Sequence, residues 1–155
     1  MKRLIAILLL LAALTSVSDG VCDEYGVFIL CNPNTNVNVR SSPKKGTSVV
    51  GWIDFGDEVL TDGEKRNGFL HVFTSGEMDG WIHSGYVVED EPRKVERAWA
   101  NVAATGRVMT YKRIGGQKNG WVEIGTQVRV YAISEEWAVT NRGYIRTKYL
   151  EVWYE

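Results

Sequence analysis

After the first 20 residues, apolar positions fall in short runs that are separated by polar turn residues. The runs EVLTD, GFLHVFT, VRVYAI and WAVT are rich in β-branched and aromatic side chains and are bounded by Gly, Asn, Asp or Ser, which is typical of strands. No stretch beyond the N-terminal segment sustains the period of an amphipathic helix. The pattern predicts an all-β fold, in which small sheets close into barrels or tight sandwiches because open edges are exposed.

One long segment of this pattern occurs twice. The phrase GWIDFGDEV, Gly51–Val59, returns as GWVEIGTQV, Gly120–Val128, at an offset of 69 residues. Further on, GWIHSGYV at 80–87 corresponds to GYIRTKYL at 143–150, at an offset of 63 residues. Most of the difference falls after GFLHVFT, where the first copy has SGEMD and the second has only NR. A length change confined to a turn indicates two copies of one fold.

The first copy resembles the bacterial SH3 domain, a small β-barrel found in many exported and cell-wall proteins. Four motifs in order carry the resemblance: NVNVRSSP, VVGWIDFGDEV, NGFLHV and DGWIHSGYV. The second copy is similar to the family but more divergent, since it keeps the G-W-V-x-x-G phrase, GYIRTKYL, and Trp137 in the place of Phe69. It lacks the N-x-R-x-x-P turn, and the 69-residue offset aligns Arg107, Met109 and Tyr111 with Asn38, Arg40 and Ser42. The resemblance implies two SH3-like barrels in tandem.

The N-terminus has the features of a secretory signal. Lys2 and Arg3 precede an apolar run from Leu4 to Leu14, and small residues Ser16 and Ser18 follow it. This run is shorter than the roughly 20 apolar residues of a membrane helix, and no later segment is both apolar and long enough. We therefore expect a signal peptide at 1–18, and an extracytoplasmic location without an integral membrane segment after cleavage. The mature chain then divides into one domain at 19–90 and another at 91–155, joined by the charged linker Glu89–Glu96 in which Pro92 interrupts strand pairing.

The two cysteines of the chain, Cys22 and Cys31, lie near the start of the mature protein. In an exported protein such a pair predicts a disulfide, here closing the hairpin CDEYGVFILC. The alternative is a lipidated Cys22, although Val21 is larger than the small residue expected before a lipid-attachment site.

Charge differs between the two copies. Residues 19–90 hold 12 Asp and Glu against 5 Lys and Arg, whereas residues 91–155 hold 7 against 11. Removal of Lys2 and Arg3 with the signal peptide takes the formal net charge from −1 to −3, which predicts no polyanionic partner such as nucleic acid. The asymmetry indicates two surfaces that either dock on each other or face different partners.

Catalytic chemistry finds little support in the sequence. Both cysteines pair plausibly with each other, and the two histidines, His71 and His83, lie in strand contexts as partly exposed surface groups. There is no Cys and His cluster, and the acidic residues are scattered, so we expect neither a metal site nor a cofactor. Glu135 and Glu136 are predicted to form a solvated hairpin tip. An enzyme is the least favoured class.

Aromatic residues make binding the better-supported class. Trp52 and Trp121 open a strand in the repeated phrase and are predicted to be core or half-core residues. Trp81 and Tyr144 are predicted to pack across strands with Phe69 and Trp137, and also to contact ligand. The candidate ligand-binding residues, which come from the family turn, the last hairpin and the aromatic positions of both copies, are Asn38, Arg40, Trp81, Tyr86, Tyr111, Tyr144 and Tyr149.

For several of these residues a structural role is equally open. Asn38 suits a turn cap and Arg40 an ion pair with the acidic first copy. Three basic residues near Tyr111 form either a solvated loop or, with that tyrosine, a contact for an anionic polymer; they are Lys112, Arg113 and Lys118.

The resemblance implies an exported, non-catalytic protein that binds a peptide or glycopeptide, with a peptidoglycan fragment as the expected ligand. The specific site is expected in the first copy, and the second is expected to add weak, salt-sensitive attraction. Two alternatives remain open: a structural protein that contacts another exported protein, and an inhibitor of a hydrolase.

Overall fold

The computed structural model describes residues 23–74, 78–103 and 106–154, and over this part of the chain the protein consists of two antiparallel sheets and two short 3-10 turns. The fold is all-β, as predicted. The predicted signal peptide and Cys22 lie outside the described residues. No helix in the described part is long and apolar enough to cross a membrane.

The first sheet has the strand order β3-β2-β7-β6-β4-β1-β8, with β5 paired to β6. Alternating side chains on these strands enclose an aliphatic core that includes Ile29, Val39 and Ile82. The elements are β1 (Tyr25–Ile29), β2 (Asn36–Arg40), β3 (Val49–Asp54), β4 (Glu58–Thr61), β5 (Lys65–Arg66), β6 (Phe69–Phe73), β7 (Asp79–His83), the 3-10 turn η1 (Ser84–Tyr86) and β8 (Val87–Val88).

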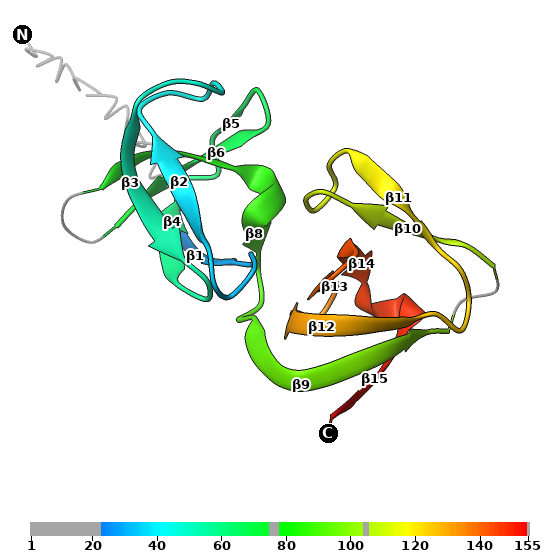
Figure 1. The fold of residues 1–155 in the computed structure, drawn as a ribbon. Helices are drawn as coiled ribbons and strands as arrows, with labels where there is room; N and C mark the ends of the chain where they lie inside the picture. The colour runs from blue at the N-terminus through cyan, green and yellow to red at the C-terminus, as the bar shows by residue number, and fades with distance from the viewer. Residues whose placement is uncertain (1–22, 75–77, 104–105, 155) are drawn as a thin grey trace, which may run out of the picture.

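The second sheet repeats this order strand for strand, as β11-β10-β14-β13-β12-β9-β15. Its core is built in the same way around Val102, Val128 and Ile145. The elements are β9 (Arg93–Val102), β10 (Val108–Tyr111), β11 (Lys118–Val122), β12 (Gln127–Ile133), β13 (Trp137–Thr140), β14 (Gly143–Arg146), the 3-10 turn η2 (Thr147–Tyr149) and β15 (Leu150–Tyr154). The repeated phrases therefore mark two copies of one topology, which lie side by side in Figure 1.

Strand register corrects the alignment of the two family turns. Arg40 pairs with Trp81 in the first sheet, and Tyr111 pairs with Tyr144 in the second. Since Trp81 and Tyr144 are equivalent in the repeat, Tyr111 stands in the place of Arg40 and not of Ser42. The reason is that the loop after this strand is shorter in the second copy, at 112–117 compared with 41–48 in the first.

Neither sheet closes its hydrogen-bond ladder into a barrel over the described residues, which corrects the closed barrels expected from the sequence. The first sheet ends at β3 and β8, and the second at β11 and β15. Irregular pairing between Val39 and Arg40, and between Thr110 and Tyr111, bends each sheet around its core. Side chains fill each core although the outermost strands stay unpaired with each other.

Those outermost strands explain why the prediction for two tryptophans was wrong. Trp52 on β3 is 65% exposed and Trp121 on β11 is 58% exposed. Neighbouring strand residues point to opposite faces, and here Ile53 and Val122 occupy the core face. The tryptophans therefore lie on the outer face, in neither a core nor a half-core position.

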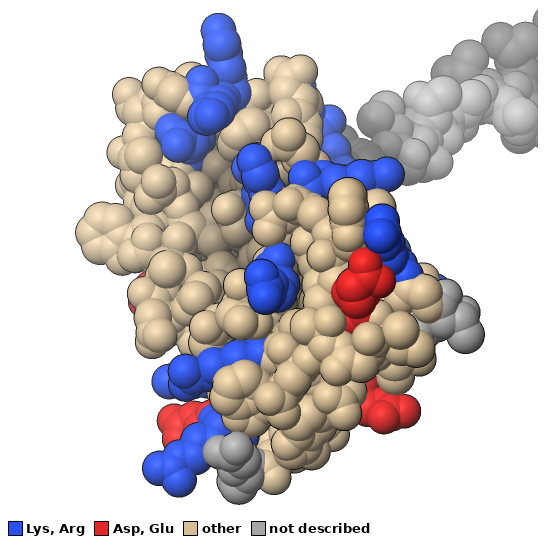
Figure 2. Space-filling view, turned by 45° about the vertical axis from the view of Figure 1, so that its right-hand side comes forward, with Lys and Arg blue, Asp and Glu red and all other residues tan. Residues whose placement is uncertain are grey.

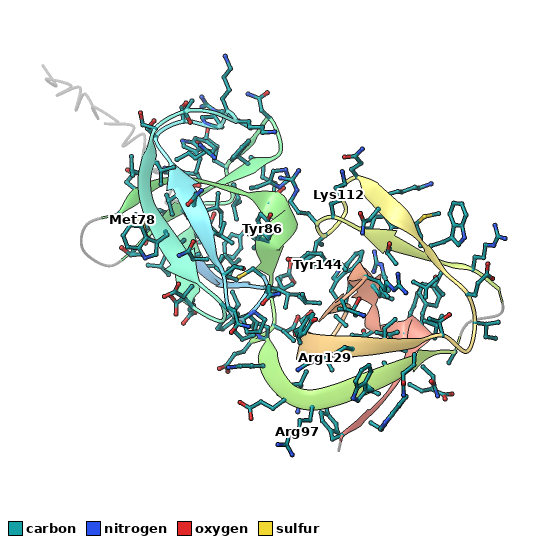
Figure 3. The ribbon with its side chains drawn as sticks, viewed as in Figure 1. Met78, Tyr86, Arg97, Lys112, Arg129 and Tyr144 are labelled. Carbon is teal, nitrogen blue, oxygen red and sulfur yellow. The ribbon has the colours of Figure 1, made fainter. Side chains whose placement is uncertain are left out.

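The first sheet with its loops, β1 to β8, forms a first unit, and the second sheet with its loops, β9 to β15, forms a second unit. A third apolar cluster joins the two units. Leu30 and Val88 of the first unit are buried together with Trp137 and Tyr144 of the second. The Tyr144 hydroxyl donates a hydrogen bond of 2.9 Å to the Leu30 carbonyl oxygen, inside this cluster. Burial strongly raises the pKa of Tyr144, so the hydroxyl remains a donor. In Figure 3, Tyr144 lies in the region between the two sheets.

The connection between the units is shorter than the predicted linker. Strand β9 begins at Arg93, so residues 93–96 belong to the second sheet, and only residues 89–92 separate β8 from β9. The division of the mature chain into domains at 19–90 and 91–155 stays a prediction.

Cys31 carries a buried thiol in this structure, and its thiol donates to the Thr35 carbonyl oxygen at 3.3 Å. Burial is the main cause that raises the pKa of this thiol. No disulfide occurs among the described residues. The pairing with Cys22 stays a prediction, which a comparison of the native and reduced masses tests.

Candidate binding pocket

A pocket of about 810 Å³ lies between β2, the β2–β3 loop, η1 and the β10–β11 loop. Eleven of its lining residues belong to the first unit and one belongs to the second. They are Asn36, Val37, Asn38, Arg40, Pro43, Lys44, Lys45, Asn67, Phe69, His83, Tyr86 and Arg113.

Strand alternation positions the amides of one wall. Val37 and Val39 point into the core, so Asn36 and Asn38, which alternate with them along β2, point outward. Trp52 is directly opposite Asn38 in the ladder, and directly opposite residues share a face of the sheet. The exposed indole of Trp52 therefore stands beside the amide wall of the pocket.

Hydrogen bonds within the first unit hold the β2–β3 loop in place. The Arg40 guanidinium donates from Nη1 to the Thr47 carbonyl oxygen at 2.8 Å. The Thr47 hydroxyl donates to the Lys44 carbonyl oxygen at 2.9 Å, and the Asn67 side-chain amide donates to the Pro43 carbonyl oxygen at 3.2 Å. The loop thus forms a fixed wall that carries Lys44 and Lys45.

Three rings form the aromatic part of the pocket. Phe69 and His83 are cross-strand neighbours with ring centroids 5.4 Å apart, and Tyr86 meets His83 edge-on at 6.2 Å. Burial and the nearby charge of Arg113 lower the pKa of His83, so the ring is neutral at pH 7. Its Nδ1 accepts a hydrogen bond from the Gly85 N–H at 3.0 Å, which leaves the proton on Nε2 as a donor.

The pocket is basic although it lies mainly on the acidic unit. Arg40, Lys44, Lys45 and Arg113 line it, and no carboxylate does among the described lining residues. Figure 2, which brings the β10–β11 side of the molecule forward, shows a face on which basic side chains predominate. This composition suits an anionic or carboxylate-bearing ligand.

The structure divides the candidate ligand residues of the sequence into three groups. Asn38, Arg40 and Tyr86 come together in the pocket. Trp81 is 9% exposed and packs against His71 with ring centroids 4.9 Å apart, and it does not line the pocket. The aromatic residues of the second copy lie elsewhere: Tyr111 and Tyr144 in the cluster between the units, and Tyr149 against the second core.

The expected partners of two aromatic residues are also wrong. Trp81 is opposite His71 and not Phe69, and Tyr144 is opposite Val139 and not Trp137. The strands are those expected, but each pairing is shifted by two residues. The guanidinium carbon of Arg66 lies 5.8 Å from the Trp81 ring centroid.

Sequence reasoning missed several pocket residues. The Lys44 and Lys45 pair next to Pro43 is a visible signal of a basic turn. Asn36, Asn67 and His83 carry no such signal, because strand pairing alone brings them to the same place. The sequence indicates Arg113 only as part of a basic loop.

A separate polar cluster lies further along the same outer face of β6 and β7 on which Phe69 and His83 line the pocket. Ligand atoms of Asp62, Glu64 and His71 lie within 4.8 Å of one another, which corrects the view that the acidic residues are scattered. His71 bonds Asp62 through Nδ1 at 2.9 Å and Asp79 through Nε2 at 2.7 Å. Both ring nitrogens are therefore already occupied, and the arrangement is that of an imidazolium between two carboxylates.

Comparison with known families identifies the first unit. Residues 35–88 match the family model for the bacterial SH3 domain. The first sheet contains a bacterial SH3 domain. Bacterial SH3 domains are typically cell-wall binding modules of exported proteins. The matched range covers every pocket residue except Arg113 and ends before the second sheet, an all-β region with the same strand order.

Among the solved structures that match, two cover most of this chain at low similarity. NlpC1 from Trichomonas vaginalis is 21% identical, with a TM-score of 0.38, over 92% of this chain and 50% of that chain. NlpC2 from Trichomonas vaginalis is 20% identical, with a TM-score of 0.36, over 83% of this chain and 48% of that chain. The chain thus spans about half the length of these structures. No curated protein matches the chain.

Proposed function

We propose that the protein is an exported, non-catalytic binding protein that holds a peptide or glycopeptide of the cell wall in the pocket of its bacterial SH3 domain. The observation that carries the proposal is the pocket itself. The pocket combines side-chain amides, an aromatic surface and four basic groups, and it lies mainly within the residues that match a wall-binding family. Amides pair with peptide groups, rings cover apolar side chains, and cations attract carboxylates.

The lining offers recognition chemistry and lacks the parts of a hydrolytic site. Among the described residues that line the pocket there is no cysteine, serine or carboxylate, so the lining does not present the Ser–His or Cys–His arrangement of a hydrolase. The exposed indole of Trp52, beside Asn38, offers a flat apolar surface of the kind that suits a sugar ring. A glycopeptide would use both features together.

Titration of the full chain with soluble wall fragments tests this proposal. Asn38→Ala and Tyr86→Phe each remove one polar contact, and we expect each to weaken binding about fivefold, which corresponds to roughly 1 kcal/mol. Asn34→Ala is the matched control, because Asn34 is exposed and lies outside this pocket. Fragments that bind all four proteins equally well would place the ligand elsewhere on the molecule.

A second candidate function has its own observation. Val49, Val50 and Trp52 are exposed along the edge strand β3, and Trp121 and Ile124 are exposed on or near β11. Exposed apolar groups on unpaired edges favour contact with another exported protein. A pull-down on purified sacculi separates the two functions, since retention by protein-free wall at moderate salt supports only the first.

A further inference from the structure

One residue of the pocket comes from the other unit. Arg113 belongs to the β10–β11 loop of the second sheet, yet it lines the pocket together with residues of β2 and η1. Its charge also contributes to the lowered pKa of His83 in the first unit. The second unit therefore supplies a wall of the pocket.

Backbone contacts fix Arg113 in this position. The Ile114 N–H donates to the Gly85 carbonyl oxygen of η1 at 3.0 Å, and the Gly116 N–H donates to the Arg113 carbonyl oxygen at 3.0 Å. A Cβ atom on Gly85 would lie 2.8 Å from the Arg113 Cβ, so the loop contacts η1 at a point where only glycine leaves room. Ile114 also packs against the apolar cluster that joins the units.

The basic groups of the pocket are not equivalent. Arg40 already donates from Nη1 to the Thr47 carbonyl oxygen and thereby holds its own loop. Arg113, Lys44 and Lys45 make no ion pair among the described residues. Arg113 is the one of these three that carries a planar guanidinium, which matches a carboxylate with two parallel donors.

We propose that the second unit completes the binding site of the first, and that Arg113 binds a free carboxylate of the peptide ligand. The inference rests on the proposed function, that is, on a peptide bound in the pocket. It assigns the second unit a specific part in recognition, in contrast to the weak, non-specific attraction expected from its net charge. Lys44 and Lys45, on the β2–β3 loop at the opposite wall, add positive charge that attracts the same carboxylate.

The test uses the full chain and one wall stem peptide in two forms, ending in a free carboxylate or in a carboxamide. Calorimetric titration of the unaltered protein is expected to show about tenfold tighter binding of the carboxylate form, since the carboxamide lacks the charge that pairs with the guanidinium. Arg113→Gln is expected to remove most of that preference, because it should weaken binding of the carboxylate form far more than binding of the carboxamide form.

Lys118→Gln is the matched control, because this substitution removes the same charge from the same hairpin and Lys118 does not line the pocket. Equal binding of the two peptides, or equal effects of the two substitutions, would overturn the role of Arg113 while leaving peptide binding in place. Binding of neither peptide would overturn this inference and the proposed function together.

Discussion

At the scale of single residues, side-chain direction on a strand decides the role of each tryptophan. Trp52 and Trp121 occupy equivalent edge positions and face outward, whereas Trp137 is buried between the units. The same residue type therefore contributes to stability in one place and to surface chemistry in another.

The first prediction follows from this difference. Trp52→Ala and Trp121→Ala should each lower the free energy of unfolding by less than about 1 kcal/mol, because little apolar surface leaves a core. The substitution at Trp121 also removes a contact with Arg107, whose guanidinium carbon lies 5.1 Å from the ring centroid. Urea unfolding measures the change, and a loss of several kcal/mol at either position would show that the residue is buried in solution.

The second prediction concerns the pH dependence of stability near His71. Burial by itself lowers the pKa of His71, but its hydrogen bonds and charge interactions with Asp62 and Asp79 outweigh burial and raise that pKa. The stabilisation is therefore complete below the unfolded value, near pH 6.5, and is lost as pH rises through the folded pKa. Glu64 is the third acidic group at this cluster.

Unfolding should be measured between pH 5 and pH 9 for the unaltered protein and for His71→Gln. The difference in unfolding free energy should shrink as pH rises. The partner Asp62 has a lowered pKa, first because of its hydrogen bond from the Glu64 N–H, and its own stabilisation is lost only as pH falls through the folded pKa. A difference that grows with pH would contradict the bridged imidazolium.

At the scale of elements, the 3-10 turn η1 is where the pocket meets the second unit. Its middle residue, Gly85, accepts a hydrogen bond from the Ile114 N–H and leaves room for the Arg113 Cβ, and its last residue, Tyr86, lines the pocket. The turn is therefore part of both the site and the contact between units.

The third prediction tests this contact. Gly85→Ala places a methyl group 2.8 Å from the Arg113 Cβ and 3.0 Å from the Ile114 carbonyl oxygen, so the β10–β11 loop must move. Thermal unfolding should shift downward, and the preference for a carboxylate ligand should fall as in Arg113→Gln. Ser84→Ala is the control in the same turn, since its hydroxyl bonds Gly68 within the first unit. Unchanged binding by Gly85→Ala would show that the loop position is not needed.

The elements also show how far the sequence leads. The repeated phrases predict the strands and the two-copy organisation, because strand patterns and turn residues are local properties. Register is not local: a shorter loop at 112–117 moves Tyr111 into the place of Arg40, and only the pairing with Tyr144 reveals it. Likewise, Asn36, His83 and Arg113 meet through tertiary packing, which no spacing in the chain encodes.

At the scale of the whole molecule, the two units share apolar packing and are not independent. Leu30 of the first unit and Trp137 of the second lie in one buried cluster, with Tyr144 bonded to the Leu30 carbonyl oxygen. A substitution in this cluster therefore affects both units, unlike one in either separate core.

The fourth prediction measures that coupling. Trp137→Ala should lower the unfolding free energy by about 3–5 kcal/mol, and Tyr144→Phe by about 1–3 kcal/mol because the buried Leu30 carbonyl loses its donor. Both changes should shift one common transition. Two separate transitions, of which only one moves, would show that the units unfold independently despite the shared cluster.

The identical strand order of the two sheets has a consequence for folding. While the chain is unfolded, each strand of one copy meets two acceptors of the same topology, its own neighbour and the equivalent strand of the other copy. Exchange of strands between copies would mismatch the unequal loops at 41–48 and 112–117 and would place Arg40 where Tyr111 contacts Trp137. Divergence between the copies thus penalises mispairing and lets a tandem of one topology reach a single native arrangement.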